Sequence, residues 1–149
     1  MGVGKAGLIA GRGLAGGQQT KTVKPYRFTR KDRSFLLPRG GASGALHDKH
    51  VALVGCGSIG GFLAFELARA GVGTLTLVDP DVLVEENIFR HVLGRKHTGG
   101  PKVHSLKKRM EEEIPYVRVS ALDARIEEAI DQGHFDSSSF DAIVCSVGG

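Results

Sequence analysis

Few cysteines, no tryptophan and no long apolar run characterise this sequence of 149 residues. The two cysteines, Cys56 and Cys145, form no C-x-x-C pair. Their spacing excludes a disulfide framework and a cysteine-based zinc site. No apolar run approaches the roughly 20 residues of a membrane-spanning helix, and glycine and arginine interrupt the apolar patch near the N-terminus too often for a secretory signal. These absences predict a cytoplasmic protein with reduced thiols and no membrane partner.

The net charge of +4 is unevenly distributed along the chain. The first 50 residues carry ten basic and two acidic side chains, and the remaining 99 carry ten basic and fourteen acidic ones. A basic arm of this kind can contact nucleic acid or another acidic surface. Beyond Tyr26, Phe28 and Phe35, this one lacks the interleaved aromatic residues of a nucleic-acid-binding arm,. We therefore predict a flexible, glycine-rich basic leader over residues 1–24, a basic lead-in segment over 25–49 and no nucleic-acid partner.

From His50 onward, apolar runs of strand length alternate with stretches of helical spacing. The first helical stretch has apolar residues at 59, 62, 63, 67 and 70, and Gly71 follows as its end signal. This alternation is typical of an α/β fold with right-handed crossovers. We expect a Rossmann-like, mostly parallel sheet with helices on both faces over residues 50–149. The predicted strands are 50–55, 74–79, 117–122 and 140–147, and the predicted helices are 59–70, 101–114 and 123–133.

A glycine-rich turn joins the first predicted strand to the first predicted helix. Gly55, Gly57 and Gly60 form the pattern G-x-G-x-x-G, with Ser58 and Ile59 between the last two. In this context the first glycine permits a tight turn, the second lets the backbone approach a phosphate, and the third lets the helix pack closely on the sheet. The free N–H groups and the positive dipole end of the helix then favour an anion. The turn predicts a bound nucleotide; the alternative is a tight turn with no ligand.

The segment after the second predicted strand indicates which nucleotide. Asp79 ends that strand, where a carboxylate can accept hydrogen bonds from ribose hydroxyls. Asp81, Asn87, Arg90 and Lys102 follow in the next 23 residues. Two cations and an amide beside a phosphate cradle suit a triphosphate better than a hydride donor. Each residue also has a structural interpretation, because arginine and lysine are usually surface charges, while Asp81 and Asn87 can cap turns or short helices.

Four stretches resemble the ThiF/HesA/ubiquitin-activating-enzyme superfamily, whose members adenylate the C-terminal glycine of ubiquitin-like and sulfur-carrier proteins. They are GCGSIGG at 55–61, VDPDVL at 78–83, ENIFRHVLG at 86–94 and GPK at 100–102. The resemblance covers about residues 50–127. It implies that Asp79 holds the ribose of ATP and that Asn87, Arg90 and Lys102 hold its phosphates. Arg90 and Lys102 are the candidate catalytic residues, and the candidate nucleotide-binding residues are Gly55, Gly57, Ser58, Ile59, Gly60, Asp79, Asp81, Asn87, Arg90 and Lys102.

The sequence departs from the family pattern after the fourth predicted strand. Family members commonly carry there an aspartate that coordinates magnesium, but this sequence has Gly148 and Gly149. The later strands of the family sheet and its carrier-binding surface are also absent, so we expect an incomplete domain. No histidine pair has convincing metal-ligand spacing, and we expect no metal site made by the chain. We expect His91 and His104 to be structural, Cys56 to serve as a small residue in the turn, and Cys145 to be a core thiol.

The leading hypothesis is therefore an ATP-dependent adenylyltransferase that uses ATP and Mg²⁺. The resemblance implies a ubiquitin-like or sulfur-carrier protein as substrate, and a homodimer in which an arginine of one protomer reaches the ATP site of the other. Arg30 stands at about the right distance before the glycine turn for that role. An NAD(P)-dependent oxidoreductase is the first alternative, although it leaves Arg90 and Lys102 without a task. A non-catalytic module that binds a nucleotide or a partner is the second.

Overall fold

The computed structural model describes residues 25–148, so the predicted leader at 1–24 lies outside the described residues. Residues 25–31 are exposed and form neither helix nor strand. The chain from Asp32 onward forms a separate compact unit, which contains every helix and strand of the described part. No helix in residues 25–148 is long and apolar enough to cross a membrane.

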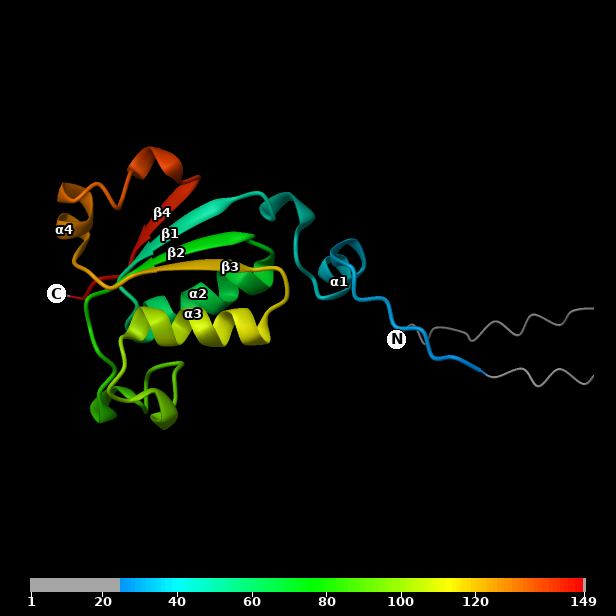
Figure 1. Ribbon diagram of the computed structural model, residues 1–149, viewed down its shortest axis with the longest axis horizontal. Helices are drawn as coiled ribbons and strands as arrows, with labels where there is room; N and C mark the ends of the chain where they lie inside the picture. Colours follow the sequence, from blue (N-terminus) through cyan, green and yellow to red (C-terminus); the bar gives the residue numbers. More distant parts are fainter. Residues whose placement is uncertain (1–24, 149) are drawn as a thin grey trace, which may run out of the picture. The chain divides into compact units, whose positions relative to one another are not determined.

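A four-stranded parallel sheet forms the centre of this unit. Its strands are β1 (His50–Val54), β2 (Thr74–Val78), β3 (Arg118–Leu122) and β4 (Ala142–Cys145), in the order β3-β2-β1-β4 (Figure 1). All three neighbouring pairs are parallel. β1 and β2 are rich in apolar residues and are buried at every position but the first, as expected of central parallel strands covered on both faces. The sequence-based prediction of a Rossmann-like α/β sheet is confirmed.

Helices cover both faces of the sheet. On one face, Leu53 of β1 packs with Phe65 of α2 (Ser58–Ala70) and Met110 of α3 (Lys102–Glu113). On the other face, Val54 packs with Ala129 of α4 (Ile126–Asp131). Neighbouring strand residues point to opposite faces, so β1 supplies both clusters. The shorter elements are α1 (Arg33–Arg39), η1 (Gly44–Leu46), η2 (Glu85–Asn87), η3 (Arg95–His97) and η4 (Ser137–Ser139).

The buried face of α2 differs from the apolar pattern in the sequence. Ile59 and Phe62 are 75% and 60% exposed, whereas the buried residues are Gly60, Gly61, Ala64, Phe65 and Ala68. Four of these five residues are small, which lets this face of the helix lie close to the sheet, and Phe65 is the one large side chain of α2 buried there. The larger apolar residues at the start of α2 are consequently left on its solvent side.

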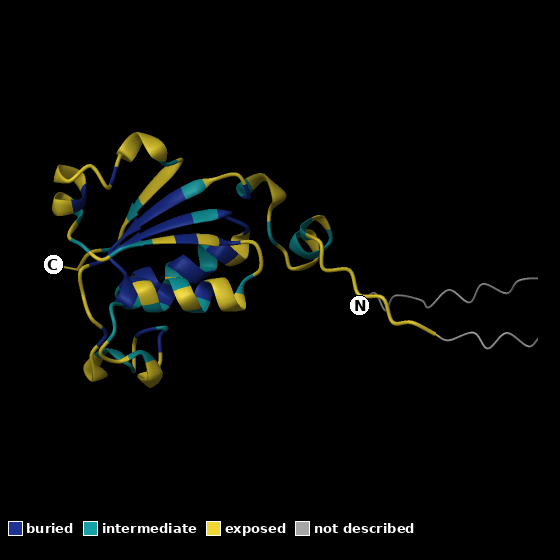
Figure 2. Ribbon diagram, in the orientation of Figure 1, coloured by how far each residue is buried: buried dark blue, intermediate teal, exposed yellow. Residues whose placement is uncertain are grey.

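Cys145 corrects the sequence-based interpretation, because it is exposed and not a core thiol. β4 is an edge strand that pairs only with β1 among the described elements. Ile143, two residues earlier on the same face, is 42% exposed. Figure 2 shows this contrast between the buried central strands and the largely exposed β4. An apolar strand at the edge of a sheet can therefore remain partly exposed.

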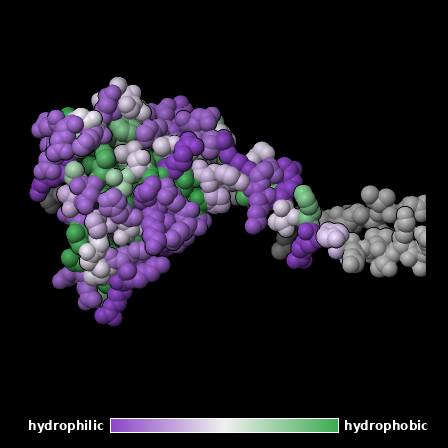
Figure 3. Space-filling view, in the orientation of Figure 1, coloured by the Kyte–Doolittle hydropathy of each residue, from purple (hydrophilic) through white to green (hydrophobic). Residues whose placement is uncertain are grey.

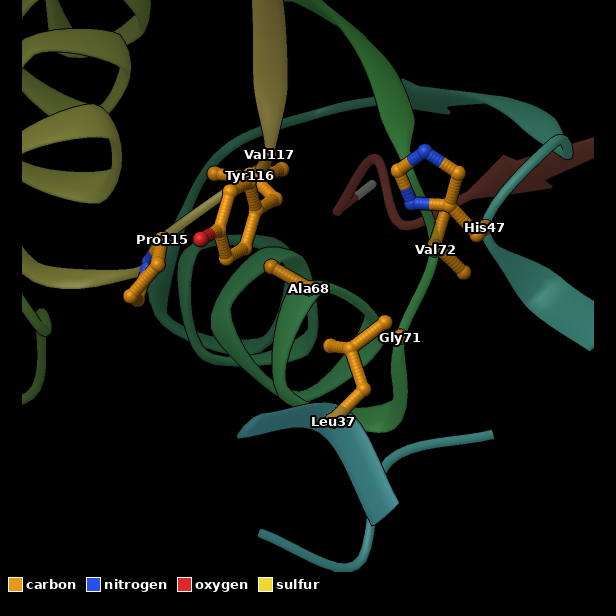
Figure 4. A pocket seen from close by; sticks show the side chains of 8 residues that line it. All are labelled: Leu37, His47, Ala68, Gly71, Val72, Pro115, Tyr116 and Val117. Atoms are coloured by element: carbon orange, nitrogen blue, oxygen red, sulfur yellow. The ribbon is translucent and has the colours of Figure 1, made fainter. Parts of the chain in front are cut away.

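A small hollow lies at the amino-terminal end of the sheet, opposite the glycine turn. Figure 4 shows Leu37 of α1 directed toward Ala68 and Gly71 at the end of α2, with Tyr116 on the far side. Tyr116 has a φ of 70°, which a non-glycine residue adopts only in a tight turn. Leu37 and His47 of the lead-in segment therefore line a hollow at the amino-terminal end of the sheet, away from the glycine turn.

Candidate functional site

The carboxyl ends of the strands meet at one edge of the sheet. Val54 pairs with both Val78 and Cys145, and Val78 pairs with Leu122. The residues that follow these strands therefore emerge side by side. Ligands bind at this edge in open α/β sheets. The glycine turn and Asp79 both belong to it.

Gly55 and Gly60 close the turn by direct backbone contact. Gly55 has a φ of 88°, which favours glycine,. A Cβ built on Gly60 would lie 1.9 Å from the carbonyl oxygen of Gly55. Ser146, which follows β4, donates its hydroxyl to the same carbonyl oxygen at 2.6 Å. Sequence reasoning did not single out Ser146, because only the pairing of β4 with β1 brings it to the turn.

Gly57 is in a different position and faces open space. A Cβ on Gly57 would meet no atom within 4 Å, and Gly57 is the N-cap of α2 without any side chain capping the helix. The first N–H groups of a helix have no partner inside the helix. The backbone at Ser58, Ile59 and Gly60 therefore presents an uncapped helix N-terminus, which fits the phosphate of a nucleotide.

Asp79 is buried and holds the glycine turn in place. One carboxylate oxygen accepts the N–H of Cys56 at 2.6 Å, and the other accepts the N–H of Asp81 at 2.8 Å. The residue is only 6% exposed. The carboxylate therefore connects the end of β2 to the turn after β1, and its remaining lone pairs are the acceptors available to a ribose.

Lys102 provides a cation beside this carboxylate. It is the first residue of α3, and its Nζ lies 4.0 Å from an oxygen of Asp79 and 2.7 Å from an oxygen of Asp81. Lys102 and Asp79 are both about nine-tenths buried, whereas the side chain of Asp81 is 65% exposed. The ion pair with Asp81 fixes the direction of the lysine. A phosphate that approached Lys102 would compete with Asp81 for it.

Asn87 and Arg90 lie on the loop between β2 and α3. Asn87 ends η2, and its Oδ1 accepts the N–H of Val84 at 3.3 Å. Asn87 therefore caps a short helix, which is the structural interpretation that the sequence allowed as an alternative to phosphate binding. Arg90 is exposed, and its guanidinium makes a long contact of 3.5 Å with the carbonyl oxygen of Glu86. The loop therefore presents an amide and a weakly held guanidinium near the cradle.

His91 and Cys56 lie behind the turn, within the core. The His91 Nε2 lies 2.8 Å from the carbonyl oxygen of Cys56, and its Nδ1 accepts the N–H of Leu93 at 3.0 Å. Burial raises the pKa of the Cys56 thiol to about 12, with the Asp79 charge acting in the same direction. Cys56 therefore stays a thiol at neutral pH and is no nucleophile.

The two cysteines should differ sharply in reactivity. We expect Cys145 to react with an aromatic disulfide reagent within minutes at pH 8, and Cys56 to stay unmodified until the chain is unfolded, because the thiolate is the reactive form. The absorbance of the released aromatic thiol gives the number of reactive cysteines under native and under denaturing conditions. A Cys145→Ser variant that still reacts quickly in the native state would contradict this assignment.

The described residues do not furnish a magnesium site. Residues 25–148 contain no group of three or more metal-binding side chains. Both oxygens of Asp79 accept backbone N–H groups, and one oxygen of Asp81 is paired with Lys102. The position after β4 that the family pattern assigns to an aspartate is Gly148. No step of a reaction can be assigned to a metal held by these side chains.

Apolar side chains border the polar groups at this edge. Figure 3 shows a mostly hydrophilic surface whose larger hydrophobic patches lie on the side to which the carboxyl ends of the strands point. Val82, Val84, Phe89 and Val147 are among the exposed apolar residues of the loops that leave this edge. Small-molecule sites typically combine apolar walls with a few polar groups, which is the composition found here.

Comparison with known proteins identifies relatives of this unit. Residues 32–147 match the ThiF family. The chain is 38% identical over 112 residues to the ATP-dependent ubiquitin transferase-like protein Cap2 of Pseudomonas aeruginosa, and 36% identical over 116 residues to the adenylyltransferase and sulfurtransferase uba4 of Emericella nidulans. These matches cover 72% and 74% of the chain, but only 21% and 24% of the relatives. The chain thus corresponds to about a quarter of their length or less.

Solved structures of two Escherichia coli proteins share the fold. The structure of MccB with ATP matches with a TM-score of 0.62 and 26% identity, over 68% of this chain and 30% of that one. The structure of TcdA, a tRNA N6-threonylcarbamoyladenosine dehydratase, in complex with ATP matches with a TM-score of 0.63 and 26% identity, over 70% and 43%. Because the ThiF family model matches most of its length, from residue 32 to residue 147, the chain belongs to the ThiF family.

Proposed function

We propose that this chain forms the nucleotide-binding part of an ATP-dependent adenylyltransferase. The observation that carries this proposal is the position of Asp79. Its carboxylate accepts the Cys56 N–H inside the glycine turn and lies 4.0 Å from the Lys102 ammonium. A phosphate cradle, a ribose acceptor and a buried cation are therefore adjacent. The relatives named as adenylyltransferases and the neighbours solved with ATP support the same assignment.

In the proposed reaction, a carboxylate oxygen of the substrate attacks the α-phosphorus of ATP. A bond forms between that oxygen and the phosphorus, the bond to the bridging oxygen of the β-phosphate breaks, and pyrophosphate leaves. No nucleophile of the protein is required. The chain contributes by holding the triphosphate for in-line attack and by stabilising the charge of the leaving pyrophosphate. We assign Gly57, Ser58, Ile59 and Gly60 to the phosphate cradle.

Arg90, Lys102 and Asn87 are the proposed phosphate ligands. The weak contact of Arg90 with Glu86 leaves its guanidinium free to turn toward a phosphate. Lys102 would exchange its contact with Asp81 for a contact with the ligand, and Asp81 would thereby regulate how readily the lysine is released. Magnesium is proposed to arrive bound to the triphosphate, since residues 25–148 contain no group of three or more side chains that could hold it alone.

The proposed substrate is the C-terminal carboxylate of a ubiquitin-like or sulfur-carrier protein, and we propose that the reaction is cytoplasmic. The support is the naming of relatives as a ubiquitin transferase-like protein and as an adenylyltransferase and sulfurtransferase. A structure of MccB with AMPCPP and a selenomethionine form of MccA indicates that one neighbour has a peptide partner. Pyrophosphate exchange with candidate carrier proteins is the experiment that tests this substrate class.

We also propose that the protein is a homodimer, and the outer face of α2 supports this. Ile59 and Phe62 are large apolar residues on a helix whose opposite face already packs on the sheet. We expect Phe62→Glu to shift the sedimentation coefficient from that of a dimer to that of a monomer, because it buries a charge in an apolar contact. Glu66→Gln, on the same helix, is the control. A monomeric unmodified chain would contradict the proposal.

The bound nucleotide should be ATP and not NAD. We expect Asp79→Ala to weaken ATP binding by about 1–3 kcal/mol, because the ribose hydroxyls lose a charged acceptor and the glycine turn loses its bond from the Cys56 N–H,. Asp123→Ala is the matched control, since Asp123 follows β3 as Asp79 follows β2 but is exposed. Isothermal titration calorimetry under the same conditions measures the affinity of each variant for ATP and for NAD. Tight binding of NAD without binding of ATP would exclude adenylation.

A further inference from the structure

His91 is a buried titratable group to which the proposed reaction gives no role. It is 8% exposed and directly follows Arg90. Its Nδ1 accepts the N–H of Leu93 at 3.0 Å and therefore carries no proton. The proton of the neutral ring must then be on Nε2, which lies 2.8 Å from the carbonyl oxygen of Cys56 and donates to it,. The two bonds together require the neutral Nε2–H tautomer.

The two partners of this imidazole belong to the two halves of the site. Cys56 lies inside the glycine turn, and Leu93 is a buried residue of the loop that carries Asn87 and Arg90. The N–H of His91 itself bonds to the carbonyl oxygen of Asn87 at 2.8 Å. A Cβ on Gly61 of α2 would lie 3.3 Å from the His91 ring, so glycine at that position gives the ring its room. The ring thus spans the gap between cradle and loop.

We propose that His91 is a positioning residue that clamps the Asn87–Arg90 loop against the glycine turn, and so sets the affinity of the site for a nucleoside triphosphate. This inference rests on the proposed function, because it assumes that the loop and the turn bind the same ligand. His91 touches no phosphate itself. It acts through Cys56 and Leu93.

The clamp has a defined dependence on pH. Burial lowers the pKa of His91 from its ordinary value, and the charges of Lys102 and Arg90 act in the same direction, while the Cys56 carbonyl and the Asp79 carboxylate oppose them. The Cys56 thiol is neutral, and Gly61 brings no charge from α2. The neutral ring is therefore intact above the ordinary histidine pKa. As the pH falls through the lowered pKa of the folded state, a proton on Nδ1 faces the N–H of Leu93, and the clamp opens.

The test compares two substitutions with the unmodified chain. The glutamine side chain can both donate and accept a hydrogen bond, and it does not titrate. His91→Gln should therefore keep the ATP affinity within about threefold of that of the unmodified chain at pH 7.5. His91→Leu should lose about tenfold in ATP affinity, as expected for the loss of a buried hydrogen bond. As the pH is lowered from 7.5 through the depressed pKa of His91, the affinity of the unmodified chain should fall relative to that of His91→Gln. The titration of the ATP phosphates affects both proteins equally. The ratio of the two ATP affinities at each pH therefore reports the effect of His91 alone.

A matched control and a ligand-free measurement make the outcome decisive. His47→Gln changes another buried histidine with a lowered pKa, at the amino end of the sheet, and should leave ATP affinity unchanged. NMR of the ligand-free chain should show the Nε2–H tautomer of His91. Equal ATP affinity and pH dependence in all variants, or an Nδ1–H tautomer, would overturn the clamp. No binding of ATP by any variant at any pH, with the expected tautomer present, would instead overturn the proposed function.

Discussion

Gly60→Ala should destabilise the fold by about 3 kcal/mol, which is at the upper end for overpacking a closed site. The added methyl group would lie 1.9 Å from the Gly55 carbonyl oxygen and 2.4 Å from the Ser146 hydroxyl. The Ser146 hydroxyl can rotate away, but the Gly55 carbonyl cannot retreat, because the N–H of Gly55 is bonded to Val78 of β2. Urea unfolding monitored by circular dichroism gives the free energy of unfolding.

Gly57→Ala is the matched control for this substitution. Its methyl group would meet no atom within 4 Å, and its φ of −71° is accessible to alanine. We expect its free energy of unfolding to stay within about 1 kcal/mol of that of the unmodified chain. Its ATP affinity should fall, because the methyl group occupies the space that a phosphate would enter. If Gly60→Ala proved as stable as Gly57→Ala, the close contact of α2 with the turn would be wrong.

Arg90→Ala should slow adenylate formation about a hundredfold, which corresponds to about 3 kcal/mol of lost transition-state stabilisation. The guanidinium is exposed and has one weak contact with the carbonyl oxygen of Glu86. Stability should therefore change by less than about 0.5 kcal/mol. ATP–pyrophosphate exchange in the presence of a carrier protein measures the rate.

Arg95→Ala serves as the control for Arg90→Ala. Arg95 is exposed on η3 of the same loop, and its contact with Glu85 is equally long at 3.5 Å. Its removal changes the net charge of the loop by the same amount but should leave the exchange rate unchanged. Wild-type exchange in Arg90→Ala, or an equal loss in both variants, would show that Arg90 has no specific phosphate contact.

Local features of the sequence were sufficient to predict the elements and the turn. Apolar runs of strand length and helical spacing predicted all four strands and α2, α3 and α4 to within a few residues. The three glycines marked the junction of β1 and α2, although only Gly55 and Gly60 meet a steric requirement that the neighbouring backbone sets. The positions of Asp79 and Lys102 at one edge followed from the parallel order of the strands.

The burial of particular side chains depended on contacts between distant segments. Periodicity alone did not reveal that Ile59 and Phe62 would face solvent, because the face of α2 that packs on the sheet consists of small residues and Phe65. Cys145 was interpreted as a core thiol because its strand is apolar. Its exposure follows from the place of β4 at the edge, which is a property of the sheet and not of the strand.

By itself, the sequence determined the α/β alternation, the glycine turn and the residue types that suit a triphosphate, because these depend on spacings of a few residues. Only the tertiary structure decided how the turn is held. Ser146 bonds to Gly55 across 91 residues of sequence, and His91 contacts Cys56 across 35. No local pattern encodes such contacts, since each needs two strands or loops to be brought to the same edge first. The pairing of Lys102 with Asp81 was decided in the same way, by the junction of β2 and α3 that sets a buried ammonium between two carboxylates.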